Sequence, residues 1–310
     1  MKKIFLFIAA TIMSVGVASA QDINEAISLA KDGQAAFEIG EYNLAIEAFQ
    51  KAINIAEGLG EAGAEHANTC KTAICTIYLS NAKNLLKAGN YDEALVKLNE
   101  TIEVAGRYGS DDTVAAATGL IPDVYMAQGT AALKAKNAAG AVEAYKKVIA
   151  LEPANGNAYL RLGSALASCG NIEEAVAAFE NAAANGKDKE AKKQLSTIFL
   201  KKAQASLKAG NSAETIDLAM KSNEYLENAN AYNLAGKAAQ KLGKNADCIA
   251  FFEKYLELKP NAKDASGVAF TIAALAQQMG NKEKAVEYYT KVAADPTYGA
   301  GAQEQLKVLK

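Results

Sequence analysis

The sequence predicts an all-α fold made of helical hairpins that repeat along the chain. Apolar residues recur three and four positions apart, as in AIEAFQKAINIA (45–56) and AVEAYKKVIALEP (141–153), which is the spacing of one face of a helix. Half of the 310 residues are apolar, only four are proline, and alternating β-branched segments are hard to find. A short polar turn followed by a small residue returns several times, which indicates a repeat.

Seven such turns divide the chain. They are GEYNLA (40–45), GNYDEA (89–94), KNAAGA (136–141), GNIEEA (170–175), GNSAET (210–215), GKNADC (243–248) and GNKEKA (280–285). The glycine can supply the left-handed residue that closes one helix, and the polar residue after it can cap the next. Lys136 replaces glycine once, where we expect a modest strain. Seven turns predict seven hairpins.

Each turn is surrounded by the same residue types at fixed distances. Seven residues before the turn all side chains are small: Gly33, Ala82, Gly129, Gly163, Ala203, Gly236 and Ala273. A glycine inside a helix costs roughly 0.5–1 kcal/mol relative to alanine, so we expect the paired helix to approach closely there. Nine residues after the turn the side chains are large, with Ala219 as the exception, and we expect them to fill the space between hairpins: Phe49, Leu98, Tyr145, Phe179, Phe252 and Tyr289.

A further position, eleven residues before the turn, is aromatic in five copies: Tyr78, Tyr125, Tyr159, Phe199 and Tyr232. Pro153 and Pro260 end second helices in LEP and LKP. In these offsets the chain resembles the tetratricopeptide repeat family, which usually carries tryptophan at the aromatic position. The resemblance covers most of the chain after residue 20. It implies a right-handed α-solenoid of about seven hairpins whose first helices line a concave groove.

The predicted boundaries follow from these offsets. The hairpins are expected at about 26–59, 75–108, 122–155, 156–189, 196–228, 229–262 and 266–299, with a capping helix over 300–310. Extra residues around 60–74 and 109–121 are interpreted as lengthened helices with a polar bend. The final helix should close the stack with a polar outer face.

Residues 1–20 have the pattern of a secretory signal peptide. Lys2 and Lys3 precede an apolar run, and Ala18-Ser19-Ala20 predicts cleavage before Gln21. No cysteine stands at the predicted new start, so no lipid attachment is expected, and no later stretch is apolar enough to cross a membrane. The sequence therefore predicts a periplasmic or secreted protein without transmembrane insertion after signal removal.

Charge argues against nucleic acid as a partner. With the two leader lysines removed, 31 basic residues face 35 acidic ones, and only Arg107 and Arg161 are arginines. Nucleic-acid binding depends on neutralising phosphates, which a mildly acidic chain with few arginines does poorly.

No catalytic residue, metal or cofactor is predicted, so the chain is not expected to be an enzyme. The sole histidine, His66, stands four residues before Cys70, but a lone pair without further ligands makes a weak metal site. Cys70, Cys75, Cys169 and Cys248 are interpreted as buried free thiols.

Lysines on the first helices are the candidate partner-binding residues. Two residues before the turn stand Lys87, Lys134, Lys208 and Lys241, and six before it stand Lys83 and Lys237. They could form a basic ladder along the groove for acidic peptides. The alternative is that lysine near a helix C-terminus only complements the helix dipole, which is worth about 0.3–1 kcal/mol.

The resemblance implies a non-enzymatic scaffold or adaptor of the cell envelope that binds a protein or peptide segment in its groove. Its partners would be other envelope proteins or peptides. The alternative function is binding of a glycan or small ligand by tyrosines without an evident packing role: Tyr42, Tyr91, Tyr108 and Tyr298.

Overall fold

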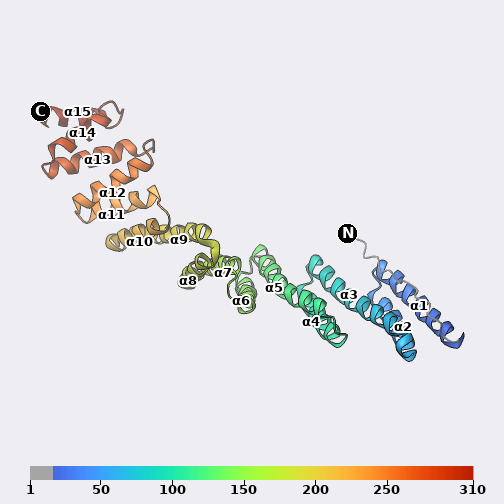
Figure 1. Cartoon of the computed structure of the whole chain (residues 1–310). Coiled ribbons are helices and arrows are strands. Elements are labelled where there is room, and N and C mark those ends of the chain that lie inside the picture. Colours follow the sequence, from blue (N-terminus) through green and yellow to red (C-terminus); the bar gives the residue numbers. More distant parts are fainter. Residues whose placement is uncertain (1–16, 310) are drawn as a thin grey trace. The chain divides into compact units, whose positions relative to one another are not determined.

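The computed structural model describes residues 17–309, and all regular structure within this range is helical. The predicted all-α architecture of stacked hairpins is confirmed (Figure 1). The chain forms two compact units, Met1–Pro153 and Ala154–Lys310. The predicted signal peptide lies outside the described residues except for its last four, which begin the first helix.

Unit 1 contains three hairpins in its described part. Their helices are α1 (Val17–Glu38) with α2 (Tyr42–Gly58), α3 (Ala64–Ala88) with α4 (Tyr91–Arg107), and α5 (Asp111–Lys134) with α6 (Ala138–Leu151). A short 3-10 turn, η1 (Gly60–Ala62), precedes α3.

Unit 2 contains four hairpins and a final helix over the residues described. They are α7 (Gly156–Cys169) with α8 (Ile172–Ala182), α9 (Asp188–Ala209) with α10 (Ser212–Tyr225), α11 (Ala229–Lys241) with α12 (Asn245–Leu258), α13 (Ala265–Gln278) with α14 (Lys282–Val292), and α15 (Gly299–Leu309). A π-helical turn, η2 (Ala183–Lys187), joins α8 to α9.

The extra residues of unit 1 lengthen its first helices. α3 and α5 have 25 and 24 residues, against 14 in α7. Gly60 and Gly109 adopt positive φ just before these helices and make the bends. Pro122 lies inside α5, where its missing N–H leaves one turn of the helix without its usual hydrogen bond. The first helices of unit 1 therefore extend well past the length that one repeat requires.

The hairpin turns share one backbone geometry. The turn glycines have φ between 68° and 86°, and Lys136 has φ 60° in the same place, as the sequence predicts. In the second turn the Asn90 N–H donates to the Leu85 carbonyl at 3.0 Å and the Gly89 N–H to the Leu86 carbonyl at 3.1 Å. These two bonds define a Schellman motif, which satisfies the last carbonyls of the helix.

Capping of the second helices by the next residue is only partly as predicted. Asn137 and Asn281 accept hydrogen bonds from the N–H groups of Gly140 and Lys284. The equivalent Asn90, Asn171 and Asn211 make no such bond. The turn is thus set by its left-handed residue, and the side-chain cap is an addition in two hairpins.

Close approach within each hairpin explains the helical glycines. A Cβ added to Gly129 would lie 2.6 Å from the Tyr145 ring, and one added to Gly236 would lie 2.5 Å from the Phe252 ring. Gly33 and Gly163 meet Phe49 and Phe179 in the same way. The predicted close approach is confirmed, and its partner is the large residue nine positions after the turn.

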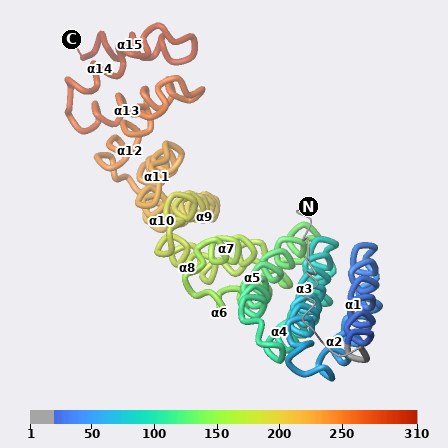
Figure 2. Tube along the Cα trace, turned by 45° about the vertical axis from the view of Figure 1, so that its right-hand side comes forward, coloured from blue at the N-terminus to red at the C-terminus, as the bar shows by residue number. Residues whose placement is uncertain are grey.

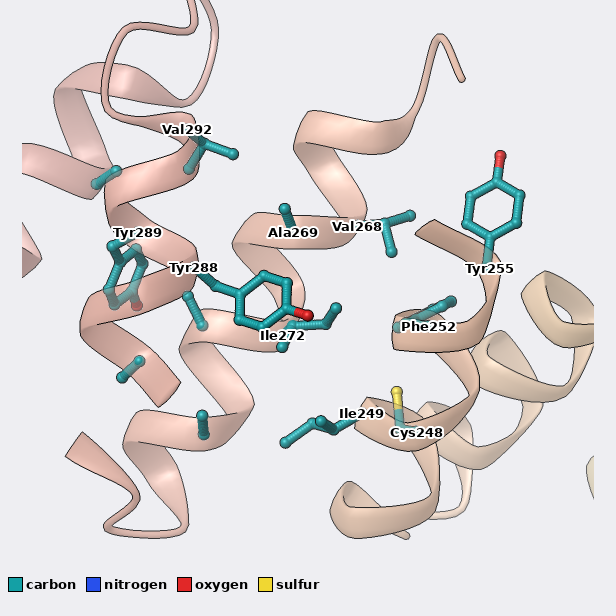
Figure 3. Close-up of a cluster of buried hydrophobic side chains, with 14 of the residues drawn as sticks. Cys248, Ile249, Phe252, Tyr255, Val268, Ala269, Ile272, Tyr288, Tyr289 and Val292 are labelled. Carbon is teal, nitrogen blue, oxygen red and sulfur yellow. The ribbon is translucent and has the colours of Figure 1, made fainter. Parts of the chain in front are cut away.

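The same large residues also contact the next hairpin. Phe252 of α12 belongs to one buried cluster with Val268 and Ile272 of α13 and with Tyr288 of α14. Figure 3 shows Val268 and Ile272 between Phe252 on one side and Tyr288 on the other. One ring therefore fixes the spacing inside its hairpin and fills the space to the next one.

The α9/α10 hairpin has a different core. Ala203 faces Ala219, and both are fully buried. Five buried polar residues lie in this hairpin: Ser196, Ser206, Ser212, Thr215 and Ser222. Elsewhere among the described residues, only Thr101 is a buried polar residue. The hydroxyls of Ser196 and Ser222 hydrogen-bond to each other at 2.9 Å. Hydrogen bonds therefore contribute to this core, in which Ala203 and Ala219 stand where four other hairpins have a glycine and an aromatic ring.

α15 closes the end of unit 2 as predicted. Ala302 is buried, and Leu306 and Leu309 pack against the cluster that α13 and α14 form. Gln303, Glu304 and Lys307 are exposed. The helix therefore covers an apolar surface and presents mainly polar side chains to solvent.

The cysteines are free, but the prediction that all four are buried is wrong for Cys169. Cys70, Cys75 and Cys248 are buried, whereas Cys169 is exposed at the end of α7. Cys169 stands directly before the turn glycine, where the side chain of the last helical residue points to solvent. Burial raises the pKa of the Cys70 and Cys248 thiols to about 11, so both stay protonated at neutral pH.

Gly236→Ala should lower the free energy of unfolding of unit 2 by about 1–3 kcal/mol, because the new methyl group overlaps the buried Phe252 ring. Helix propensity alone favours alanine by roughly 1 kcal/mol, so the sign of the change separates the two effects. Gly119→Ala in α5 is the matched control, since no atom lies within 4 Å of its added Cβ, and it should be stabilising. Urea unfolding measures both; an equally stable Gly236→Ala variant would contradict the contact.

A thiol-specific reagent should modify one cysteine per native chain at pH 8, because only the exposed Cys169 is accessible. Denaturant should release three more thiols, and Cys169→Ser should abolish the native signal. Mass spectrometry of the labelled peptides counts the sites. Rapid native labelling of Cys70 or Cys248 would show that the core is open.

Candidate functional site

The first helices of successive hairpins form a layer of their own. α3 contacts both α1 and α5, and α9 contacts α11, whereas second helices of neighbouring hairpins approach each other less closely in the part of the chain that is described. Figures 1 and 2 both show α1, α3 and α5 along one side of unit 1, with α2, α4 and α6 along the other. Within each unit, we call the outer surface of this layer the first-helix face, and these faces are the candidate sites.

The six lysines predicted as a groove ladder are all exposed. Lys83, Lys87 and Lys134 belong to unit 1, and Lys208, Lys237 and Lys241 belong to unit 2. None of them forms an ion pair with another residue described here. The structure therefore gives two groups of three lysines, one on each unit.

The lysines of unit 1 have acidic neighbours in the same layer. α1, α3 and α5 together carry five lysines and eight acidic residues. Asp111, Asp112 and Asp123 lie on α5, beside the helix of Lys83 and Lys87. The first helices of unit 1 therefore carry more acidic than basic residues, and the predicted lysines lie among acidic neighbours.

Unit 2 has a strong separation of charge between its two layers. Its first helices α7, α9, α11 and α13 carry nine basic residues and two acidic ones, Asp188 and Glu190. Its second helices α8, α10, α12 and α14 carry eleven acidic residues and five lysines. The first-helix layer of unit 2 is therefore positive and the second-helix layer negative.

Much of the positive charge lies on α9, which the offsets from the turn did not single out. Four exposed lysines, at positions 189, 193, 201 and 208, fall on one stripe of this helix by their spacing. Lys237 and Lys241 lie on the contacting helix α11. The high number of lysines between residues 187 and 208 is the feature of the sequence that could have predicted this positive charge.

Apolar side chains on the first helices were also missed. Ten and three residues before the turn, the side chains are apolar and only partly buried in several hairpins: Phe37, Leu79, Leu86, Met126, Leu133, Leu160, Leu200 and Leu207. The position ten before the turn is four residues from the polar position six before the turn, and the position three before the turn is three residues from it. This spacing places all three positions on one face of the helix. We call these side chains the apolar rows. Their shared offsets were the signal that could have found them.

Lys237 lies near a small polar cluster. Asp264 accepts hydrogen bonds from the Tyr255 hydroxyl and from Asn233 Nδ2. Burial acts to raise the pKa of Asp264, but the hydrogen bonds from Tyr255 and Asn233 and the charge of Lys237 outweigh it and lower the pKa. Burial and the Asp264 carboxylate raise the pKa of Tyr255 to about 12. These hydrogen bonds connect Asp264, in the loop before α13, to Asn233 on the first helix α11.

Two shallow hollows border the second helices. One, of about 440 Å³, is lined by five residues of α2 and Tyr78 of α3: Asn43, Ile46, Glu47, Gln50, Lys51 and Tyr78. The other, of about 520 Å³, lies between α12 and α14. Both are open and mixed in polarity, so neither has the enclosed apolar shape of a small-molecule site.

The four tyrosines considered for glycan binding are engaged in packing. The Tyr42 ring lies 6.0 Å from the Phe37 ring, and Tyr91 packs against the cluster between α3 and α4. The Tyr108 hydroxyl donates to Gln50, and Tyr298 packs against Phe270. A stacking platform needs an open ring face, and contacts with neighbouring helices cover part of these rings.

The described residues contain no group of three or more histidine, cysteine or acidic side chains placed to hold a metal ion. His66 Nε2 is buried without a hydrogen-bond partner, and Cys70 is buried one turn further along α3. Within residues 17–309 no helix combines the length and the apolar character needed to cross a membrane.

Solved structures similar to this chain include residues 41 to the end of MamA from Desulfovibrio magneticus RS-1, at 18% identity over 55% of this chain and 92% of that one, with a TM-score of 0.32. PilW, described as a type IV pilus biogenesis factor, is similar at 16% identity over 75% and 98%, with a TM-score of 0.31. TTC0263, a thermophilic repeat protein of Thermus thermophilus, is similar at 13% identity over 61% and 98%, with a TM-score of 0.27. A search of curated proteins finds no match.

Two sequence profiles, both described as tetratricopeptide repeat, match the chain. One matches residues 132–198 and the other matches residues 33–58, 229–262 and 267–294. The matched segments include hairpins of both units. They contain four turn glycines, Gly40, Gly170, Gly243 and Gly280, and three of the four glycine–ring contacts, those of Gly33, Gly163 and Gly236. The chain belongs to the tetratricopeptide repeat family.

Proposed function

We propose that this protein is a non-catalytic scaffold of the cell envelope that binds a segment of another protein along its first-helix face. Tetratricopeptide repeat proteins are generally protein-interaction scaffolds, which supports the broad function. The observation that supports the site is the presence of the apolar rows on consecutive first helices, partly exposed and interrupted by polar side chains.

The apolar rows suit an amphipathic or extended segment better than a small ligand. On α3, Leu79, Lys83 and Leu86 share one face, and on α5 Met126, Thr130 and Leu133 repeat the arrangement. An apolar side chain of a partner can bury surface on the leucines while polar groups beside it keep the segment in register. The preformed helices supply this surface without a cost of ordering on the protein side.

The six lysines remain candidate contacts at the border of this face. In unit 1 the acidic residues of α1 and α5 offset the positive charge of these lysines. The lysines there would orient a bound partner but contribute little to its affinity for the protein. In unit 2 the absence of acidic residues on α7, α11 and α13 makes their contribution larger.

Replacing Leu86 and Leu133 together by glutamine should weaken partner binding at least tenfold, which corresponds to about 1.4 kcal/mol, because both side chains would lose apolar contact with the partner. Val96→Gln on α4 is the matched control, since this valine is 55% exposed on a second helix. A photo-crosslinking residue at position 86 in the native envelope identifies the partner, and its binding to each variant can then be titrated. Equal loss for Val96→Gln, or none for the leucine pair, would contradict the proposed face.

The envelope location depends on the signal peptide pattern of residues 1–20. Intact-mass analysis of the protein from an osmotic-shock fraction should give a chain that starts at Gln21, which would shorten α1 by its first four residues. Recovery of the full-length chain from the cytoplasm alone would refute the location and leave the binding proposal standing.

A further inference from the structure

The two charged layers of unit 2 form complementary surfaces on one chain. We define the basic surface as six exposed lysines, four on α9 and two on α11: Lys189, Lys193, Lys201, Lys208, Lys237 and Lys241. We define the acidic surface as six exposed carboxylates, three on α8 and three on α10: Glu173, Glu174, Glu180, Glu214, Asp217 and Glu224. The two sets match in number and are opposite in sign.

These charges are poorly compensated within the chain. None of the six lysines of the basic surface forms an ion pair in the described structure, although Lys237 lies near Asp264, and Asp188 and Glu190 flank Lys189 on α9. On the acidic surface only Glu173 reaches a lysine, Lys202, at 3.9 Å. The hydrogen bonds of Glu180 to Tyr225 and of Glu214 to Ser206 come from neutral groups and leave the charge in place. Each surface therefore retains a field that an opposite surface can neutralise.

The surfaces occupy different layers of the unit. The basic surface lies on first helices and the acidic surface on second helices, and no ion pair joins the two surfaces in the described structure. A second copy of the chain can bring its acidic surface onto the basic surface of the first. Since each copy carries both surfaces, such a contact is head-to-tail and can repeat.

We propose that unit 2 mediates self-association, in which the acidic surface of one copy docks on the basic surface of the next. Single exposed ion pairs contribute only about 0–1 kcal/mol each, so the contact depends on several pairs acting together. It is correspondingly sensitive to salt and concentration. The low net charge of the chain, −2 at pH 7, opposes such association only weakly. This inference does not depend on the apolar rows of unit 1.

Charge reversal and mixing test the proposal. One variant carries Lys193→Glu, Lys201→Glu, Lys208→Glu and Lys237→Glu, and the other carries Glu173→Lys, Glu174→Lys, Asp217→Lys and Glu224→Lys. Each variant alone presents two surfaces of the same sign and should be monomeric. Mixed together, they again offer opposite surfaces and should assemble in equal proportion. Lys31→Glu, Lys83→Glu, Lys87→Glu and Lys134→Glu in unit 1 form the control and should leave self-association unchanged.

Sedimentation velocity of the intact chain supplies the readout, with circular dichroism to check that each variant is folded. Raising the salt from about 0.05 to 0.5 M, which shortens the Debye length, should weaken the wild-type association at least tenfold. A wild-type chain that stays monomeric at low salt would overturn the proposal, as would a mixture of folded variants that fails to assemble. Binding of an acidic peptide to the basic surface without self-association would likewise refute it in favour of a different occupant.

Discussion

The contact between a helical glycine and the aromatic ring of the paired helix sets the geometry on which much of the structure depends. It brings two helices closer than side chains on both would allow, and it repeats in four hairpins. A Schellman turn with one left-handed residue then closes each hairpin at this short distance. The ring also reaches the following hairpin, so the same interaction determines local pairing and the stacking of neighbours. Contacts between sequence neighbours are enough to build each unit.

Because these contacts are local and periodic, most of the fold could be predicted from the sequence. The turn glycines and the left-handed Lys136 follow from the spacing of the repeat, and α15 follows from the residues after the last hairpin. The sequence pattern could not show that Cys169 is exposed, because burial next to a turn depends on the direction of one side chain. The division into two units was also not predicted, since the repeat continues in sequence across Pro153.

The candidate site was harder to predict. A shared offset placed six lysines on first helices, but their electrostatic effect depends on the charges of neighbouring helices, and these differ between the units. Asp111 and Asp123 offset the lysines of unit 1, whereas α11 and α13 carry no acidic residue. The residue type at one offset therefore says little about the electrostatic potential of a surface. That potential depends on the net charge of all the helices in the layer. The apolar rows lie on the same face of these helices as the position six residues before the turn, where Lys83 and Lys237 stand.

The serine-rich core of the α9/α10 hairpin has a consequence for the surface above it. α9 carries four lysines of the basic surface, and the hairpin that holds α9 in place has alanines where four of the other hairpins have a glycine and a ring. Five of the buried side chains in this hairpin carry a hydroxyl group, which gains less from the hydrophobic effect than an apolar group of similar size. A molecule that binds only the folded form of this hairpin stabilises it by mass action. Binding at the basic surface and the stability of the α9/α10 hairpin are therefore thermodynamically linked. A change in hairpin stability would indicate binding, and a change in binding would indicate altered hairpin stability.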